Sequence, residues 1–312
     1  MEKIAILGAG RVGEAAAQFI AQRELAREVL LYDIRPGAAR GAALDILQTA
    51  PYLRFDTRVV GSEEPAAMAG AELVVVTAGV PRKPGMSRSD VLDTNVAVID
   101  GLVDEVLRHA PDALLLMVTN PVDVLTWRAW RRTGWPRNRV FGQAGVLDAS
   151  RMATFIAQAT GFSTRDITTL VLGGHGDAMV PLPRLSTVGG VPIDRFLSPE
   201  QIRDIIRRTR DGGAEILALR KNASAYDAPG AAVATMVDAI GRRRRLLPCV
   251  AVLQGEYAQD DIALGVPCIL DETGVAQVVE LPLDEEERRA LALSAAGVAT
   301  DIQRLRTAGE SD

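Results

Sequence analysis

The chain has 312 residues, of which 48% are hydrophobic and 24% are charged, and its formal net charge is −5. This composition is typical of a soluble globular protein, and the length supports a large core in one or two domains. The acidic balance argues against nucleic acid and an anionic membrane as partners, and no apolar run approaches the ~18 residues of a membrane span.

The amino-terminal segment MEKIAILGAG has one lysine and no apolar stretch of signal-peptide length, so we expect no removable leader. The two cysteines, Cys249 and Cys268, both lie in apolar runs. We therefore expect two buried thiols in a reducing cytoplasm rather than a disulfide. Neither belongs to a CxxC motif or a Cys/His cluster, so the sequence predicts no metal site.

Short apolar runs alternate with stretches of helical spacing in the first half of the chain. The runs are rich in Val, Ile and Leu, which predicts parallel strands covered on both faces. The predicted strands are residues 4–7, 29–32, 59–60, 73–77 and 114–118, and the predicted helices are residues 12–22, 40–48 and 89–107. This alternation predicts an α/β fold whose N-terminal domain, residues 1–144, contains a doubly wound parallel (Rossmann) sheet.

The pattern changes after Gly145. A predicted helix, strand and glycine-rich turn come first, and Ser198-Pro199-Glu200-Gln201 then predicts a helix start with an N-cap and a capping box. The predicted helix covers residues 149–160, the strands are residues 168–172, 250–253, 262–264, 268–270 and 275–280, and a last helix begins at Asp284. We predict a C-terminal mixed α+β substrate domain over residues 145–312.

A glycine motif, Gly8-Ala9-Gly10-Arg11-Val12-Gly13, directly follows the first predicted strand and opens a helix. Gly8 would make the tight turn, Gly10 would let the backbone approach a pyrophosphate, and Gly13 would let the helix pack on the strand. The motif alone is a weak signal, because a glycine-rich turn without a ligand has the same spacing.

Asp33 strengthens this interpretation, because it lies at the end of the second predicted strand, twenty residues after Gly13. A carboxylate there can accept hydrogen bonds from the ribose hydroxyls of an adenosine and would repel a 2′-phosphate. The sequence therefore predicts a dinucleotide site that favours NAD over NADP. Arg35 lies nearby and could soften that preference.

The chain has two histidines. His109 ends a predicted helix, where a surface role is expected. His175 lies in the turn Gly173-Gly174-His175-Gly176-Asp177, whose glycines allow close approach by a ligand. Without further context, a histidine in a glycine turn can serve the local structure or bind a ligand, and both interpretations stay open. Because hydride transfer from a secondary alcohol releases a proton and an imidazole titrates near neutral pH, His175 is a candidate proton acceptor.

Asp148 and Arg151 lie near the start of the predicted helix after Gly145. A carboxylate would orient the histidine and stabilise its protonated form, although Asp148 would also serve as an ordinary helix N-cap. Because Arg151 follows three residues later, both side chains point the same way. A guanidinium beside an acid–base pair is what a substrate carboxylate requires.

A basic loop follows the strand at residues 73–77 and runs from Ala78 to Arg88. It leaves the predicted sheet at the carboxyl edge, where α/β proteins bind their ligands. Its cations are either solvated, or they close over an anionic substrate.

Together these motifs resemble the lactate/malate dehydrogenase family, most closely its malate dehydrogenases of the lactate-dehydrogenase-like type. The stretches that carry the resemblance occur in the family's order: GAGRVG, PRKPGMSR, VTNPVDVLT, AGVLDASR, GGHGDAMVP, NASAYDAPGAA and GVPCIL. The resemblance implies that His175 is the proton acceptor and Asp148 orients it. It also implies that Arg151 holds the substrate carboxylate, Arg88 polarises the reacting carbonyl, and Asn120 positions the substrate near the nicotinamide.

The resemblance further implies NAD as the cofactor and no metal. The implied cofactor-binding residues are Gly8, Gly10, Arg11, Val12, Gly13, Asp33, Asn95, Val118 and Asn120. Where the family's malate enzymes usually read SAYYAP, this chain has Asp227 in place of the second tyrosine. This departure affects details of the pocket but leaves the charge pairing between arginines and substrate carboxylates unchanged.

Arg82 falls where the family sets its substrate: malate enzymes carry Arg there and lactate enzymes usually Gln, and Met86 also fits the malate pattern. Oxaloacetate has a second carboxylate that can pair with Arg82, whereas pyruvate would leave the guanidinium buried without a partner. We therefore expect a small dicarboxylate as the substrate, the malate/oxaloacetate pair of the tricarboxylic acid cycle.

Two alternatives stay open at this point: a lactate or other 2-hydroxy-acid dehydrogenase, and a non-catalytic NAD-binding protein. The second predicts a degraded catalytic set, yet Arg88, Asp148, Arg151 and His175 are all present. The family also implies a homo-oligomer, with a tetramer favoured and a dimer as the other possibility.

Overall fold

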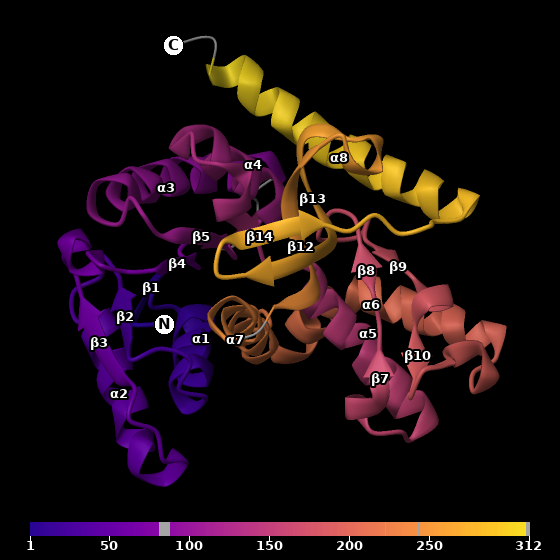
Figure 1. The fold of residues 1–312 in the computed structure, drawn as a ribbon, viewed down its shortest axis with the longest axis horizontal. Helices are drawn as coiled ribbons and strands as arrows, with labels where there is room; N and C mark the ends of the chain where they lie inside the picture. The colour runs from indigo at the N-terminus through magenta and orange to yellow at the C-terminus, as the bar shows by residue number, and fades with distance from the viewer. Residues whose placement is uncertain (81–87, 222, 243, 310–312) are drawn as a thin grey trace. The chain divides into compact units, whose positions relative to one another are not determined.

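The computed structural model describes residues 1–80, 88–221, 223–242 and 244–309, shown as a ribbon in Figure 1. Its internal contacts group the chain into two units. Unit 1 comprises Met1–Gln143, Tyr226–Arg245 and Ile269–Gln277, and unit 2 comprises Ala144–Ala225, Leu246–Cys268 and Val278–Asp312. The predicted domain boundary after residue 144 lies one residue beyond the first segment of unit 1. Unit 1 also includes two later segments of the chain.

Six parallel strands lie side by side in the sheet of unit 1. They are β1 (Lys3–Leu7), β2 (Glu28–Tyr32), β3 (Arg58–Ser62), β4 (Leu73–Val76), β5 (Leu114–Met117) and β6 (Val140–Gly142). Their order is β3-β2-β1-β4-β5-β6, with all five neighbouring pairs parallel. The strand order reverses direction between β1 and β4, which is the switch point of a doubly wound sheet. The predicted Rossmann sheet is thus confirmed.

The strands of unit 1 are apolar because helices cover them on both faces. Every residue of β4 and β5 is buried, and each fully buried Val or Leu contributes about 1.5–3 kcal/mol to the free energy of folding. The covering helices are α1 (Arg11–Gln22), α2 (Ala38–Leu53), α3 (Arg88–His109) and α4 (Val122–Thr133). In Figure 1, α3 and α4 lie on one side of β4 and β5, and α1 lies on the other.

Helix α7 (Asp227–Gly241) also packs in unit 1, although it comes late in the chain. It is apolar over most of its circumference, which is typical of a helix buried on nearly every side. At Gly230 a Cβ would lie only 2.7 Å from the Cβ of Ala15, so a glycine is required where α7 crosses α1. Linear sequence does not reveal such a return to an earlier domain.

Unit 2 combines helices with small sheets, so the predicted mixed α+β architecture is confirmed. Its helices are α5 (Gly145–Thr160), α6 (Pro199–Arg220) and α8 (Glu285–Gly309). The sheets are β11–β10–β7 (Val191–Pro192, Thr187–Val188, Ile167–Thr168) and the pair β8 (Val171–Leu172) and β9 (Val180–Pro181). The predicted strand at 168–172 is therefore wrong as a single element, because β7 and β8 belong to different sheets.

Three longer strands follow α7 and are neighbours in the order β14-β13-β12: β12 (Arg245–Gln254), β13 (Asp260–Asp271) and β14 (Gly274–Val278). The strands predicted at 262–264 and 268–270 are one strand, β13. Short 3₁₀ helices complete the fold: Pro65–Met68, Arg137–Arg139, Thr164–Asp166, Pro183–Leu185, Ile193–Arg195 and Glu256–Ala258. None of the described helices is both long and apolar enough to cross a membrane.

The helix starts predicted at Ser198 and Asp284 are confirmed, whereas α5 begins at Gly145 rather than at Ala149, so Asp148 lies in its first turn and is not its N-cap. The Ser198 hydroxyl accepts from the Gln201 amide at 3.3 Å, and the Gln201 side chain accepts from the Ser198 amide at 2.9 Å, a complete capping box at α6. Asp284 and Glu287 make the same reciprocal pair before α8. Cys249 and Cys268 are buried free thiols, and burial raises the pKa of the Cys268 thiol.

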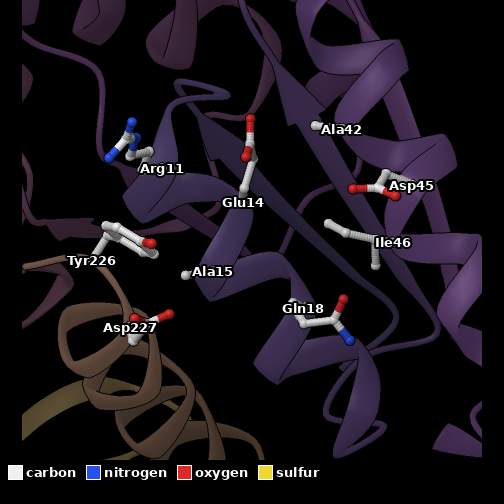
Figure 2. Close-up of a pocket in the computed structure, with 9 residues that line it drawn as sticks. All are labelled: Arg11, Glu14, Ala15, Gln18, Ala42, Asp45, Ile46, Tyr226 and Asp227. Carbon is white, nitrogen blue, oxygen red and sulfur yellow. The ribbon is translucent and has the colours of Figure 1, made fainter. Parts of the chain in front are cut away.

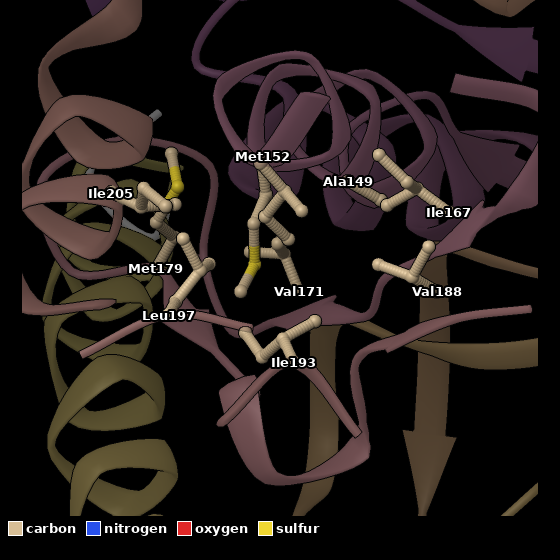
Figure 3. Close-up of a cluster of buried hydrophobic side chains, with 10 residues drawn as sticks. Ala149, Met152, Ile167, Val171, Met179, Val188, Ile193, Leu197 and Ile205 are labelled. Carbon is tan, nitrogen blue, oxygen red and sulfur yellow. The ribbon is translucent and has the colours of Figure 1, made fainter. Parts of the chain in front are cut away.

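An apolar cluster in unit 2 packs around α5 and holds it in place. Figure 3 shows its side chains converging from α5, α6 and the surrounding small strands and turns. Its members are Ala149, Met152, Ile156, Ile167, Val171, Met179, Val188, Ile193, Leu197 and Ile205. Because α5 also carries Asp148 and Arg151, this packing fixes the helix from which both candidate site residues project.

Candidate active site

The glycine turn between β1 and α1 is required by close backbone packing at two of its positions. Gly8 has φ +111°, and a Cβ on it would lie 2.6 Å from the Ala78 nitrogen. A Cβ on Gly13 would overlap the Gly8 carbonyl oxygen. These two glycines therefore bring the start of α1 against β1 and the end of β4.

Gly10 differs from its two neighbours in the motif. It is the N-cap residue of α1, and a Cβ built on it would meet no atom within 4 Å. No side chain caps the helix there, and the amides of the first turn, Arg11 to Gly13, have no acceptor within the helix. Unpaired amides at the positive end of a helix dipole favour an anion. The space beside Gly10 suits the pyrophosphate of a dinucleotide.

Asp33 follows β2, and its carboxylate links the turn after β2 to the glycine motif through hydrogen bonds. The Ala9 amide donates to its Oδ2 at 2.9 Å, and the Arg35 amide donates to its Oδ1 at 2.9 Å. The Arg35 guanidinium makes a two-pronged pair with the same carboxylate. Burial raises the pKa of Asp33, but the hydrogen bonds from Arg35 and Ala9 lower it by more. The carboxylate is thus ionised at neutral pH and acts as a hydrogen-bond acceptor at both oxygens.

Asn95, on α3, lies between the loops that follow β4 and β5. Its Oδ1 accepts from the Val80 amide at 2.7 Å, and its Nδ2 donates to the carbonyls of Asn120 at 2.8 Å and Val80 at 3.3 Å. The buried Asn95 side chain therefore ties the two loops together. Its amide is committed to backbone groups, which is a structural role that the sequence did not predict.

Val118 and Asn120 stand directly after β5, at the same carboxyl edge of the sheet as Gly8–Gly13, Asp33 and Val80. Val118 is buried and Asn120 is exposed, and the Asn120–Pro121 peptide bond is cis. The Thr119 hydroxyl donates to the Ala78 carbonyl at 2.7 Å, which adds a second tie between the two loops. The structure thus brings the predicted cofactor residues of unit 1 to one edge of its sheet.

The side chain of Arg11 contacts Tyr226, whereas its backbone belongs to the glycine turn between β1 and α1. Its guanidinium lies 5.5 Å from the centre of the Tyr226 ring, a cation–π contact. Figure 2 shows Arg11 above Tyr226 at the edge of a depression of about 360 Å³ formed by α1, α2 and the start of α7. Asp227, the residue that departs from the family pattern, lines this depression. A cofactor would meet the amide of Arg11 rather than its guanidinium.

His175, Asp148 and Arg151 form a connected set in unit 2. The His175 Nδ1 lies 2.8 Å from the Asp148 Oδ2, and the Arg151 Nη1 donates to the Asp148 Oδ1 at 3.0 Å. Asp148 is only 2% exposed. A buried carboxylate beside Nδ1 favours the tautomer with the proton on Nδ1, which makes Nε2 the nitrogen that exchanges protons with a substrate.

The loop that presents His175 is fixed by α8 and β13. The Gly174 amide donates to the buried Ser294 hydroxyl at 2.8 Å, and the Gly173 amide donates to the Gly265 carbonyl at 2.8 Å. Gly173 has φ +84°, and a Cβ on it would lie 2.7 Å from the Ser294 Oγ. Sequence reasoning missed Ser294, because nothing local links α8 to a loop 120 positions earlier.

Arg151 lies along α6 at a position where that helix has no side chain. A Cβ on Gly212 would lie 3.1 Å from the Arg151 Cδ. The Arg151 side chain is 12% exposed, and its buried Nε has no hydrogen-bond partner among the described residues. A buried donor without a partner is costly unless a ligand completes it, so Arg151 is equipped to receive an anionic group beside the His175–Asp148 pair.

The remaining predicted residues lie outside what the structure describes. Arg82, Lys83 and Met86 belong to residues 81–87, and the side chain of Arg88 at the start of α3 is not described. His109 ends α3 as predicted, with its Nε2 at 3.3 Å from Glu105. Among the described residues, no group of three or more His, Cys, Asp or Glu is placed to hold a metal ion.

A doubly wound sheet with a glycine turn at the start of its first helix, and a histidine paired with a buried carboxylate beside a partly buried arginine, are together features of a nicotinamide-dependent dehydrogenase. Comparison with known families agrees. Residues 2–142 match the model of the lactate/malate dehydrogenase NAD binding domain, and residues 145–307 match that of the lactate/malate dehydrogenase alpha/beta C-terminal domain. The chain belongs to the lactate/malate dehydrogenase family, its cofactor is NAD, and it is an oxidoreductase.

Individual relatives are similar over nearly the whole chain. A malate dehydrogenase of Thioalkalivibrio sulfidiphilus is 64% identical over 307 residues, which are 98% of this chain and 100% of the relative. The structure of a malate dehydrogenase from Salinibacter ruber has a TM-score of 0.93 at 41% identity, covering 98% of this chain and 99% of that one. A lactate dehydrogenase of Cryptosporidium parvum, complexed with lactic acid and NAD, has a TM-score of 0.93 at 36% identity, covering 98% of each chain.

Proposed function

We propose that the protein interconverts malate and oxaloacetate, with NAD as the cofactor and His175 as the proton acceptor and donor. The observation that carries the reaction is the hydrogen-bonded set His175–Asp148–Arg151. The substrate rests on Arg82 in the basic loop and on the 64% identity to a malate dehydrogenase. NAD supplies the hydride acceptor when bound, and the protein's residues supply binding, orientation and the proton acceptor.

Proton transfer falls to His175. In the direction of malate oxidation its Nε2 takes the hydroxyl proton, and the imidazolium that forms lies next to the buried Asp148 carboxylate, which stabilises it. In the reverse direction the same nitrogen returns the proton to the alcohol oxygen. Asp148 also accepts from Arg151, so one carboxylate orients both the base and the anion-binding group.

Substrate binding falls to three arginines in this proposal. Arg151 takes the carboxylate next to the reacting carbon, because its guanidinium lies beside the His175–Asp148 pair and has a buried donor without a partner. Arg88 polarises the carbonyl oxygen, and Arg82 pairs with the second carboxylate that malate has and lactate lacks. Asn120 positions the substrate from the loop after β5.

The glycine motif gives a matched pair of substitutions that tests the proposed pyrophosphate site. Gly13→Ala is expected to lower the free energy of unfolding by about 2 kcal/mol or more, because its Cβ overlaps the Gly8 carbonyl. Gly10→Ala meets no atom, so it should fold normally and weaken NADH binding about tenfold. Thermal denaturation and NADH titration of both variants check this; a Gly10→Ala protein with unchanged NADH affinity would place the pyrophosphate elsewhere.

Cofactor choice is expected to depend on Asp33. Because carboxylate and phosphate repel each other at contact, kcat/KM for NADH should exceed that for NADPH by roughly a hundredfold. Steady-state rates with each cofactor at a fixed oxaloacetate concentration measure the ratio. Equal values of kcat/KM would contradict the role of Asp33.

Catalysis itself is tested by incubating the purified protein with NAD and malate, and separately with NAD and lactate. We expect NADH to appear from malate, with oxaloacetate formed and protons released in equal amounts, and lactate to react far more slowly. The lactate alternative would reverse this order. If the protein binds NADH but forms none from either acid, the non-catalytic alternative is correct.

We also propose an assembly, a compartment and a metabolic setting for the protein. The family's usual assembly supports a homo-oligomer, with a tetramer favoured over a dimer, and the two free buried thiols suit a reducing cytoplasm. Malate oxidation would place the protein in the tricarboxylic acid cycle. Sedimentation at micromolar concentration measures the assembly directly.

A further inference from the structure

The Asp33 carboxylate is fully occupied within the protein. A carboxylate offers two acceptor positions on each oxygen. Oδ1 accepts from the backbone amide and the Nε of Arg35, each at 2.9 Å, and Oδ2 accepts from the Ala9 amide and the Arg35 Nη2, each at 2.9 Å. Three of these four hydrogen bonds come from Arg35, so ribose hydroxyls can bind Asp33 only where a donor leaves.

The donor that leaves is the guanidinium. The two backbone amides belong to the glycine turn and to the turn after β2, which the sheet fixes. The Arg35 side chain is 62% exposed and can swing into solvent once its bonds to Asp33 and to the Ala9 carbonyl are released. Binding of the adenosine ribose therefore exchanges guanidinium hydrogen bonds for hydroxyl hydrogen bonds at one carboxylate.

We propose that Arg35 is a specificity-determining residue, whose guanidinium competes with the adenosine ribose of NAD for Asp33 and, when displaced, pairs with the 2′-phosphate of NADP. This inference rests on the proposed role of Asp33. Arg35 weakens NAD binding by holding the acceptor, and it strengthens NADP binding by supplying a cation that offsets the Asp33 charge. It thus narrows the preference that Asp33 creates.

Two substitutions separate the hydrogen-bonding fork from the positive charge. Arg35→Met keeps an unbranched stem but removes both, whereas Arg35→Lys keeps the charge and cannot make the two-pronged pair. Arg35→Met should bind NADH about threefold tighter and NADPH about tenfold weaker. Arg35→Lys should show the same increase in NADH affinity as Arg35→Met, but it should keep most of the NADPH affinity of the wild type.

Arg58 provides a matched control. It is also an exposed arginine of unit 1, with a side chain 72% exposed, and it also pairs with a carboxylate, Glu28 at 3.4 Å. It lies at the start of β3, however, at the opposite end of the strands from Asp33. Arg58→Gln removes the same charge from the protein and should leave both affinities unchanged.

The experiment is an equilibrium titration of NADH and NADPH against the full chain, following the fluorescence of the bound nicotinamide. The proteins are the wild type, Arg35→Met, Arg35→Lys, Arg58→Gln and Asp33→Asn. A ratio of dissociation constants, NADPH over NADH, that rises about thirtyfold in Arg35→Met but not in Arg58→Gln supports the proposal.

Failure of the inference and failure of the Asp33 role give different results. If Asp33→Asn weakens NADH binding while Arg35→Met leaves the ratio unchanged, or weakens NADH, the role of Arg35 is wrong and that of Asp33 stands. If Asp33→Asn leaves both affinities unchanged, the role of Asp33 is wrong and the inference about Arg35 falls with it.

Discussion

Replacing His175 with alanine is expected to lower kcat for oxaloacetate reduction about 10²–10⁴-fold, the usual contribution of a positioned acid or base. His175 is the proposed proton acceptor and donor, and its Nδ1 lies 2.8 Å from the Oδ2 of the buried Asp148. NADH affinity should persist, because the residues assigned to the cofactor lie in unit 1 and His175 lies in unit 2. Steady-state kinetics and an NADH titration on the same preparation measure both quantities.

The other histidine makes a matched control. His109→Ala removes an imidazole that also faces a carboxylate, Glu105, but at the end of α3. It should leave kcat unchanged. A His175→Ala enzyme that keeps near-normal kcat would show that another group carries the proton, and loss of NADH binding in that variant would show that His175 serves the cofactor instead.

Asp148 should matter through His175 rather than through the substrate. Asp148→Asn keeps the size of the side chain but favours the wrong imidazole tautomer, and it removes the charge that stabilises the imidazolium. If Asp148 is a positioning residue, Asp148→Asn should lower kcat, as His175→Ala does. The kcat of the double variant should then be little lower than that of either single variant.

Arg82→Gln is expected to lower kcat/KM for oxaloacetate about 10²–10⁴-fold, since it removes a desolvated charge pair worth about 3–5 kcal/mol. Pyruvate reduction should hold or rise, because no guanidinium is then buried without a partner. Arg82 lies outside the described residues, so this prediction rests on its position in the basic loop and on charge complementarity. The oxaloacetate/pyruvate ratio of kcat/KM is the quantity to compare.

Two other cationic residues of the basic loop, Lys83 and Arg88, serve as controls. Arg88→Gln should depress both substrates alike, because Arg88 acts on the carbonyl that oxaloacetate and pyruvate share. Lys83→Gln tests the rival explanation, in which the overall charge of the loop selects the substrate. That explanation requires Lys83→Gln to change the ratio as much as Arg82→Gln does, and an unchanged ratio in Arg82→Gln would remove the physical basis for malate.

The parallel sheet could be predicted from sequence because its strands are continuous apolar runs, as in β4 (LVVV) and β5 (LLLM). β6 was missed, since its three residues are too few to form a recognisable run. Helix α4 was missed as well. Its first turn is rich in β-branched residues, which favour strands. The helix is marked mainly by its ends, Pro121 before it and Gly134 after it.

The error at β13 has a functional reason. Gly265 and Pro267 look like a turn, so two strands were predicted where the structure has one. A Cβ on Gly265 would overlap the carbonyl oxygen of Gly173, which shows that the glycine serves a close backbone approach to the loop of His175. Glycine in a strand then marks proximity to the site rather than the end of the strand.

The candidate site was predictable where residue types lie close in sequence, as for Asp148 and Arg151 on one turn of α5. The pairing of Asp148 with His175 was a hypothesis from chemistry, and the structure places the two side chains in contact. Long-range supports were not predictable. Ser294 and Gly212 act on His175 and Arg151 from other helices, and the full occupation of Asp33 by Arg35 needs coordinates to be seen.

This protein is expected to act on a four-carbon dicarboxylate rather than on a monocarboxylate. Its preference is given by kcat/KM for oxaloacetate and for pyruvate, each measured with saturating NADH and the wild-type protein. Oxaloacetate should be favoured by about 10²-fold or more, the discrimination expected when a buried arginine is left without its partner. Equal values, or a preference for pyruvate, would contradict it.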